Sequence, residues 1–185
     1  MQRRHNLLHS VLLFGFSLVL FSAALADEKS DFEQKHAEEV RQIKQKLERL
    51  HSAALSYLKV HQGVWAQCPD AIADSEADDA NAKYETWWRK TLEPFGAKKE
   101  DWLHAKHPGS HAFQITEFEP ERLAAFQYAS QPWFVTTHFI SPEKVIYMIF
   151  PEGNIMAMPF DTDLLPKPGG SIKVRPAKIP DDLKP

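Results

Sequence analysis

Three histidines in the middle of the chain have the spacing best suited to chemistry. His104, His107 and His111 form the pattern H-x2-H-x3-H, and neutral imidazoles at such spacing can bind zinc, copper or nickel. However, Pro108 and Gly109 break any helix that would align the three rings. Neither a carboxylate nor a thiolate lies nearby in the sequence as an obvious fourth ligand. The pattern therefore favours a solvated loop, with metal binding as the weaker alternative.

An acidic loop, residues 70–85, could supply oxygen ligands to a cation. Its acids at alternate positions, and a further acid eleven residues after the first, are Asp74, Glu76, Asp78 and Glu85. This spacing faintly resembles that of a calcium-binding loop. The sixth position, however, holds Asp79 instead of the glycine that makes the sharp turn, and the third holds a glutamate. An exposed run of charges is the favoured interpretation, and no metal ion is predicted.

Cys68 is the only cysteine, so no disulfide can form within the chain. The thiol is buried and inert, free, or paired with another molecule. The buried state is favoured, because unpaired cysteines are among the most buried residues. A catalytic thiol needs a base within reach and a depressed pKa, whereas the carboxylate of Asp70 opposes the thiolate. Whether His61 or another histidine approaches the thiol is left open by the sequence.

Other signatures of catalysis are missing from the sequence. It contains no G-x-S-x-G turn, no phosphate-binding loop and no H-E-x-x-H helix. No pair of carboxylates stands out for hydrolytic work, although any two acids can meet in a fold. We therefore predict a protein that is not an enzyme and has neither catalytic residues nor a cofactor.

Five tryptophans could line a ligand groove or fill the core. They are Trp65, Trp87, Trp88, Trp102 and Trp133. Each indole buries a large apolar area, and a single domain of this size needs such side chains in its interior. The core is the favoured place for them.

The first 26 residues read as a secretory signal peptide. Arg3 and Arg4 precede a mostly apolar stretch, and residues 24–26 place small side chains before the charged run that begins at Asp27. The alternative is an uncleaved membrane anchor, since the apolar stretch approaches the roughly 20 residues that span a bilayer. Cleavage after Ala26 is predicted, which gives a periplasmic or secreted protein.

The mature chain, residues 27–185, has 159 residues, enough for one domain with its own core. Loss of the two leader arginines leaves 20 basic and 25 acidic side chains, a net charge of −5. This balance provides no broad basic face for nucleic acid or anionic lipid. Protein partners are therefore favoured over nucleic acid, and a membrane is involved only if the leader stays uncleaved.

A long amphipathic helix is predicted over residues 30–62. Ser30 and Glu33 form a capping box at its start, and Gly63 is placed to end it in a left-handed conformation. Its apolar seam recurs at three- and four-residue steps and consists of Val40, Ile43, Leu47, Leu50, Ala54, Tyr57 and Leu58. A seam of so few heptads favours packing on its own domain over a coiled coil with a partner helix.

The rest of the chain predicts a second helix and a few strands. A loop over 66–82 leads to an aromatic helix over 81–93, which Pro94 and Gly96 stop. A short turn is expected near residues 100–103, and strand patterns begin at residue 112 and again at 133–140. The clearest hairpin joins 145–150 to 155–160 through the turn Pro151-Glu152-Gly153-Asn154. Residues 161–185, rich in proline, are expected to form an extended or disordered tail that buries little.

Several short motifs resemble the head region of type II secretion pseudopilins and related pilin-like proteins. The likeness covers roughly residues 45–160. It lies in the helix end with its following Gly-Val-Trp, in two tryptophan-containing stretches, in a Gln-Pro-Trp-Phe motif and in the hairpin turn, at residues 54–58, 63–65, 87–96, 102–103, 131–134 and 150–154. The resemblance implies a long helix that leads through a loop into a small antiparallel sheet, in a protein that works by assembly with others.

The N-terminus departs from the pattern of that family. Residues 15–19 resemble the start of a prepilin helix, but Leu20 stands where the family has glutamate, and the apolar run from Phe16 to Ala26 is about half a membrane span. His104 lies near the place where relatives have a Cys-Pro pair. The expected product is a soluble pilin-like head that begins at Asp27 and lacks the filament stem.

Together these patterns predict an α+β domain over residues 27–160. Its long N-terminal helix packs on a three- or four-stranded antiparallel sheet, with the short aromatic helix between them. We expect an exported, non-enzymatic, pilin-like protein that acts through protein–protein contacts, related to a type II secretion or surface assembly. The exposed part of the long helix and the tryptophan-rich loops are the expected contact surfaces. The alternative is a soluble periplasmic metal- or ligand-binding protein that uses the His104–His111 loop or the acidic loop 70–85; a hydrolase comes third.

Overall fold

The computed structural model describes residues 34–69, 72, 80–103, 113–137, 145–159 and 175–184. The chain divides into two units, residues 1–40 and 41–185. Of the first unit only the helical start from residue 34 to residue 40 is described. The signal peptide and the capping box predicted at Ser30 and Glu33 lie outside the described residues. Within those residues, no helix is both long and apolar enough to cross a membrane.

Helix α2, Ala37–Val60, is the long helix that the periodicity predicts. Its seam is buried as expected, with Ala53 added: the buried members are Val40, Ile43, Leu47, Leu50, Ala53, Ala54 and Leu58. Tyr57 is the exception, because it is only half-buried and stacks on His61 at a centroid distance of 4.0 Å. The helix ends as predicted, with Gly63 at φ +83°.

Helix α4, Ala80–Leu92, is the predicted aromatic helix. It ends where Pro94 enters the 3-10 turn η1, Glu93–Phe95, and Gly96 closes that turn at φ +104°. A second 3-10 turn, η2, covers Lys99–Asp101 and overlaps the turn predicted near residues 100–103. Trp88 fixes α4 to the domain, because its ring lies 5.8 Å from that of Trp65, which follows α2.

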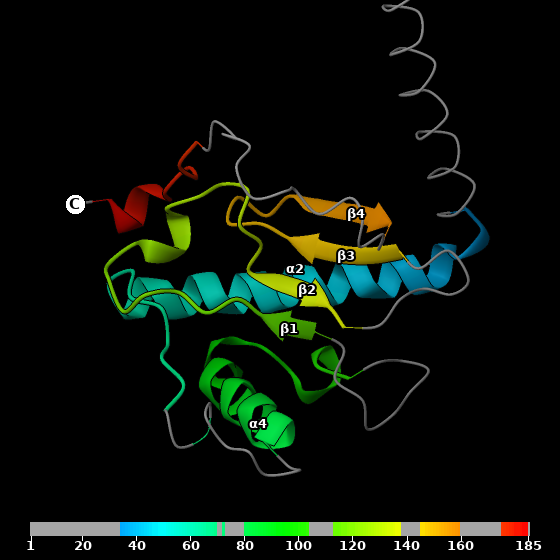
Figure 1. Cartoon of the computed structure of the whole chain (residues 1–185), viewed down its shortest axis with the longest axis horizontal. Helices are drawn as coiled ribbons and strands as arrows, with labels where there is room; N and C mark the ends of the chain where they lie inside the picture. Colours follow the sequence, from blue (N-terminus) through cyan, green and yellow to red (C-terminus); the bar gives the residue numbers. More distant parts are fainter. Residues whose placement is uncertain are drawn as a thin grey trace, which may run out of the picture. The chain divides into compact units, whose positions relative to one another are not determined.

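Four antiparallel strands form one sheet in the described residues, in the order β1-β2-β3-β4. The strands are β1, Phe113–Ile115; β2, Phe134–Thr136; β3, Val145–Ile149; and β4, Ile155–Pro159. The predicted hairpin is confirmed, since β3 and β4 pair from Val145 with Pro159 to Ile149 with Ile155. The α+β class with a long helix and an antiparallel sheet is therefore confirmed at this level (Figure 1).

Helix α2 lies along one face of the sheet (Figure 1). Buried side chains of the helix and of the strands form the core. Side chains directly opposite each other on neighbouring strands share a face. Phe134 pairs with Ile149, and Ile149 lies two residues from Tyr147 on β3. The three side chains therefore lie on one face of the sheet. The Lys44 ammonium of α2 lies 5.8 Å from the Tyr147 ring centroid, so this is the face that the helix covers.

The C-terminal segment 175–184, hereafter the strap, lies in the tail predicted to be extended or disordered and to bury little, but it docks on the domain. Ala177 and Leu183 are buried, and the 3-10 turn η5, Asp181–Leu183, lies within the segment. The Ala129 amide donates to the Arg175 carbonyl and the Ala177 amide donates to the Phe126 carbonyl, both at 3.0 Å. Composition alone missed this docking, because two small buried contacts and a few hydrogen bonds leave almost no mark on hydropathy.

Candidate interaction surface

Most residues predicted as possible metal ligands lie outside the described part of the chain. These are His104, His107 and His111 of the histidine loop and Asp74, Glu76 and Asp78 of the acidic loop. Glu85 is described, and it lies half-buried on α4 rather than in a loop. Among the residues that the structure does describe, no group of three or more histidine, cysteine or acidic side chains could hold a metal ion.

Cys68 lies in surroundings that oppose its ionisation. The thiol is half-buried and free, so the prediction of a buried cysteine is only partly met. Burial raises its pKa, and the Glu117 carboxylate raises it further. Burial also raises the pKa of the Tyr84 phenol, and the nearby Glu117 and Cys68 raise that pKa further. A protonated thiol is a poor nucleophile, so this cluster disfavours catalysis at Cys68.

Asp101 is the most deeply buried acid among the described residues, and its contacts are structural. One carboxylate oxygen accepts a hydrogen bond from Arg49 Nε at 2.6 Å, and the other accepts from the Lys98 amide at 2.9 Å. The carboxylate thereby closes the turn η2 and ties it to helix α2. With both oxygens engaged and 1% of the residue exposed, Asp101 serves as a tie between elements.

His51 is a buried histidine of the helix seam that sequence reasoning missed. Its ring stacks on Trp133 at 4.8 Å, and its Nε2 lies 3.0 Å from the Pro151 carbonyl oxygen in the β3–β4 turn. Gly153 of that turn has φ +81°, a conformation that favours glycine, and a Cβ there would make only an ordinary contact with His51 Cε1, at 3.5 Å. His51 therefore positions the hairpin turn on helix α2, one hundred residues away in sequence.

The environment of His51 predicts a pH-dependent stability. Burial lowers its pKa from the ordinary 6.5, against the opposing hydrogen bonds to the carbonyls of Pro151 and Phe150. As the pH falls through 6.5, the unfolded chain takes up the proton first, so the stability that is complete above 6.5 decreases until the folded-state pKa is passed. Urea unfolding across this range should show the decrease, and His51→Gln should flatten it. An unchanged slope in the variant would contradict this role of His51.

The tryptophans belong to the core, as favoured. Trp65, Trp88, Trp102 and Trp133 are each exposed by 2% or less, while Trp87 is half-buried. The Trp133 indole donates to the Ala125 carbonyl at 2.8 Å. These four rings are therefore enclosed and not available to a partner, and the use of the tryptophan-rich loops as a contact surface stays a prediction.

The second face of the sheet is also apolar, and this is the candidate interaction surface. Val135 pairs with Met148, Met148 pairs with Met156, and Ile146 pairs with Met158. Paired residues share a face of the sheet, and successive residues of a strand point to opposite faces. These residues therefore lie on the face opposite Phe134 and Tyr147, which α2 covers. We call the set Val135, Ile146, Met148, Met156 and Met158 the methionine face.

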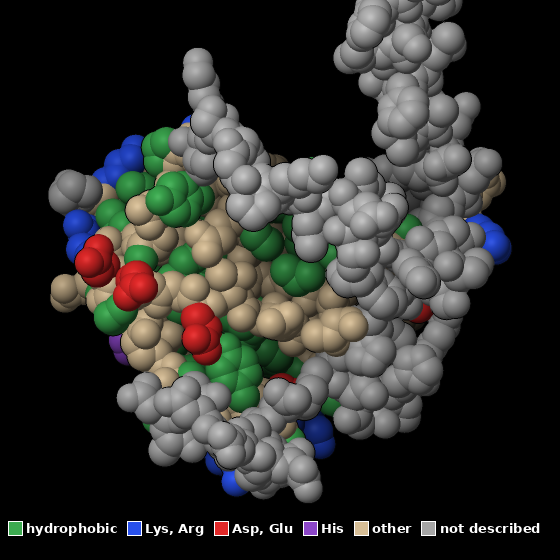
Figure 2. Space-filling model, viewed as in Figure 1, with side chains coloured by type: hydrophobic (Ala, Val, Ile, Leu, Met, Phe, Trp, Pro, Cys, Tyr) green, Lys and Arg blue, Asp and Glu red, His purple; other side chains and the backbone are tan. Residues whose placement is uncertain are grey.

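Two members of the methionine face are open to solvent. Met156 is 48% exposed and Met158 is 36% exposed, which places both among the large apolar side chains most exposed in the described residues. Both belong to β4, the last strand in the sheet order. Figure 2, drawn in the orientation of Figure 1, shows hydrophobic side chains among polar ones over the described part of this side. The sequence signalled this second apolar face, because residues 145–150 and 155–160 are apolar at nearly every position and so place apolar side chains on both faces of a strand.

The outward face of helix α2, the other expected contact surface, is polar. Arg41, Glu48, Ser52 and Lys59 are exposed there, opposite the buried seam. Such a mixed polar face is typical of a solvated helix surface.

Comparisons with family models, with curated proteins and with solved structures each gave no match for this chain.

Proposed function

We propose that this is an exported, non-enzymatic protein with a pilin-like architecture that acts by binding a protein partner at the methionine face. The observation that carries the proposal is the exposure of Met156 and Met158 on β4, the last strand of the sheet in the described part of the chain. The partner element is an extended apolar segment of another protein, which pairs with the edge of β4 and covers the methionine side chains.

The physical chemistry of this surface suits an extended segment. An edge strand presents backbone donors and acceptors to which another strand can add. Methionine side chains are flexible and polarizable, so they adapt to varied apolar partners. Burying one such side chain contributes roughly 1.5–3 kcal/mol, so two can supply much of a moderate affinity.

The polar groups of the described core support a role other than catalysis. Asp101 and His51 are engaged in ties between elements, and the Cys68 thiol has a raised pKa. The long helix on an antiparallel sheet is the arrangement that the pilin-like resemblance implies. Together with the leader-like start of the sequence, this favours an exported binding protein over a periplasmic enzyme.

In-cell crosslinking tests the proposal. A photoreactive phenylalanine analogue at position 156 or 158 should give a defined adduct with another protein in intact cells, and the adduct should carry a chain that begins at Asp27. Met158→Lys should reduce the adduct from position 156 by roughly tenfold, because a charge on an apolar contact costs at least 1.4 kcal/mol. Mass spectrometry of the excised adduct identifies the partner and the N-terminal residue.

The control positions lie on the polar face of α2. The same analogue at Ser52, which is exposed, should give no such adduct, and Gln45→Lys should not weaken the adduct from position 156. Equal adducts from positions 52 and 156 would contradict a specific surface. An adduct between two copies of this chain would contradict a foreign partner, and a chain that begins at Met1 or Phe16 would contradict export by signal cleavage.

A further inference from the structure

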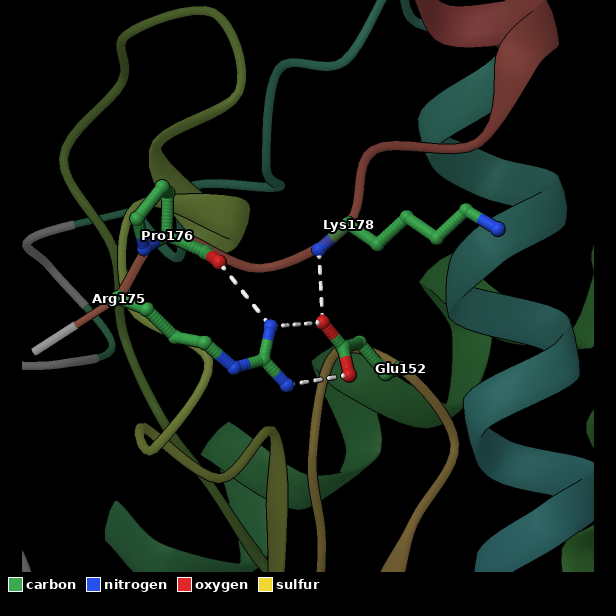
Figure 3. Close-up of polar contacts among 4 residues, drawn as sticks. All are labelled: Glu152, Arg175, Pro176 and Lys178. Carbon is green, nitrogen blue, oxygen red and sulfur yellow. Dashed lines mark hydrogen bonds and ion pairs between the residues drawn. The ribbon is translucent and has the colours of Figure 1, made fainter.

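The strap is attached at its beginning by a charged contact with the β3–β4 turn. Arg175 donates from Nη1 and Nη2 to the two carboxylate oxygens of Glu152, at 2.6 and 2.8 Å, and the Lys178 amide donates to the same carboxylate at 2.8 Å (Figure 3). These bonds to Arg175 and Lys178 lower the pKa of Glu152 to about 2. The carboxylate therefore stays charged over the whole physiological pH range.

The far end of the strap is held by Arg122 and by Lys59 of helix α2. Arg122 donates from Nη2 to the Leu183 carbonyl at 2.8 Å and from Nε to the Gln62 carbonyl at 3.1 Å. Lys59, in the last turn of α2, lies 2.8 Å from the Asp182 carboxylate. The residues that hold the strap through side chain or backbone, which we call the seat, are Lys59, Arg122, Phe126, Ala129 and Glu152.

The backbone beneath the seat is strained. Gln62 and Leu123 have φ of +56° and +65°, and no other described residue apart from glycine has positive φ. The two segments are joined here, because the Leu123 amide donates at 2.8 Å to the carbonyl of Gly63, the residue after Gln62. Such conformations cost about 1–3 kcal/mol each and cluster at sites that bind or switch. The seat therefore combines a strained backbone with hydrogen-bond donors and acceptors that contact a peptide.

Detaching the strap disturbs little of the core. Only Ala177 and Leu183 of its ten described residues are buried, and its ion pairs lie at the surface. Arg175 is 65% exposed, and exposed ion pairs contribute little net stability. Segments with few buried contacts open at low free-energy cost while the rest of the fold persists. The strap is thus a separable peptide ligand carried by its own chain.

The chain is long enough for the strap to reach another copy. Fifteen residues, 160–174, separate the end of β4 at Pro159 from Arg175. A chain of that length spans at most about 50 Å when extended. Because the seat and the strap are identical in every copy, exchange preserves every contact between them. Reciprocal exchange of one element between two protomers gives a closed dimer.

We propose that the strap is exchanged between two copies of this protein, each strap occupying the seat of the other copy. At low concentration the tether favours each chain's own seat, because a short linker gives an effective concentration of roughly millimolar. Exchange dominates where copies are crowded to similar concentrations or held side by side on an assembly. This inference concerns a surface other than the methionine face and does not rest on the partner proposed there.

A pair of charge reversals tests the exchange. Glu152→Arg and Arg175→Glu each place like charges at the strap's own seat. In a mixture of the two variants, each strap finds an opposite charge only on the other chain, at both seats. The mixture should therefore form a heterodimer at least about tenfold more tightly than either variant associates with itself, a difference of about 1.4 kcal/mol. Native mass spectrometry and sedimentation over a concentration series measure this.

Two controls separate exchange from a general charge effect. The double variant Glu152→Arg with Arg175→Glu in one chain restores the opposite charges in cis and should sediment as the original protein does. Lys184→Glu changes a strap charge that forms an ion pair with Asp181 of the strap itself, and mixing it with Glu152→Arg should give no added heterodimer.

The outcome that would overturn the proposal is a mixture of folded single variants that stays as monomeric as its components. If the reversals prevent folding, Glu152→Gln and Arg175→Gln answer the same question. Their mixture contains one unaltered Arg175–Glu152 pair across chains, and neither variant alone contains any. A neutral pair without excess heterodimer would likewise contradict exchange and assign the strap to its own chain alone.

Discussion

Trp133→Ala should lower the free energy of unfolding by about 3–5 kcal/mol, the cost of removing a large aromatic side chain from a filled core. Trp133 is fully buried and lies immediately before β2. Its ring lies 4.8 Å from His51, 5.1 Å from Trp65 and 5.3 Å from Phe126. The indole also donates to the Ala125 carbonyl, so the substitution leaves both a cavity and an unpaired acceptor.

The size of this effect is large compared with the stability of a small domain, about 5–15 kcal/mol. Urea unfolding followed by circular dichroism measures it. The matched control is Trp87→Ala, since Trp87 is half-buried and makes its described aromatic contact only with Trp88, at 4.9 Å. We expect the control to lose markedly less. Equal losses at the two positions would show that Trp133 is not the centre of the core.

Asp101→Ala is the second substitution with a large expected effect, about 1.5–3 kcal/mol, the range for hydrogen bonds to a buried charged group. The alanine leaves the Lys98 amide without its acceptor and Arg49 without its carboxylate. Both losses release the turn η2 from helix α2. The exposure of Arg49, 44% at the side chain, allows water to replace part of the ion pair and keeps the effect below that of Trp133.

The neighbouring acid provides the control for Asp101. Glu100 is exposed, and Glu100→Ala should change the free energy of unfolding by no more than about 0.5 kcal/mol. Asp101→Asn distinguishes charge from geometry, because the amide keeps one acceptor oxygen. Denaturant midpoints of the three variants at one pH decide the matter. If Glu100→Ala and Asp101→Ala are equally destabilised, the buried carboxylate is not the tie that holds η2.

Two surfaces give this protein its proposed contacts, and they differ in chemistry. The methionine face is apolar and extends to β4, the last strand of the described sheet, which suits an extended segment of a foreign protein. The seat is polar: the Glu152 carboxylate binds an arginine side chain, and Arg122 donates to a backbone carbonyl of the bound peptide. Salt should weaken contacts at the seat more than contacts at the methionine face, because only the former depend on exposed charges.

The elements themselves could be read from local patterns. The three- and four-residue periodicity defined helix α2 and all but one of its predicted seam residues, and the turn at 151–154 defined the β3–β4 hairpin. Pro94 and Gly63 marked helix ends for reasons of backbone geometry alone. These signals are local: each depends on the conformations of a few consecutive residues, so no knowledge of distant partners was needed.

The tertiary structure alone decided what each surface faces. The apolar residues at 145–159 occupy both faces of β3 and β4, and only the packing of α2 on one of them leaves Met156 and Met158 exposed on the other. His51, at a seam position, is buried because Trp133 and Pro151 meet it, and the strap docks because Glu152 meets Arg175. Those contacts join residues from 23 to 100 positions apart, and a local pattern carries no information on which distant group will be the partner.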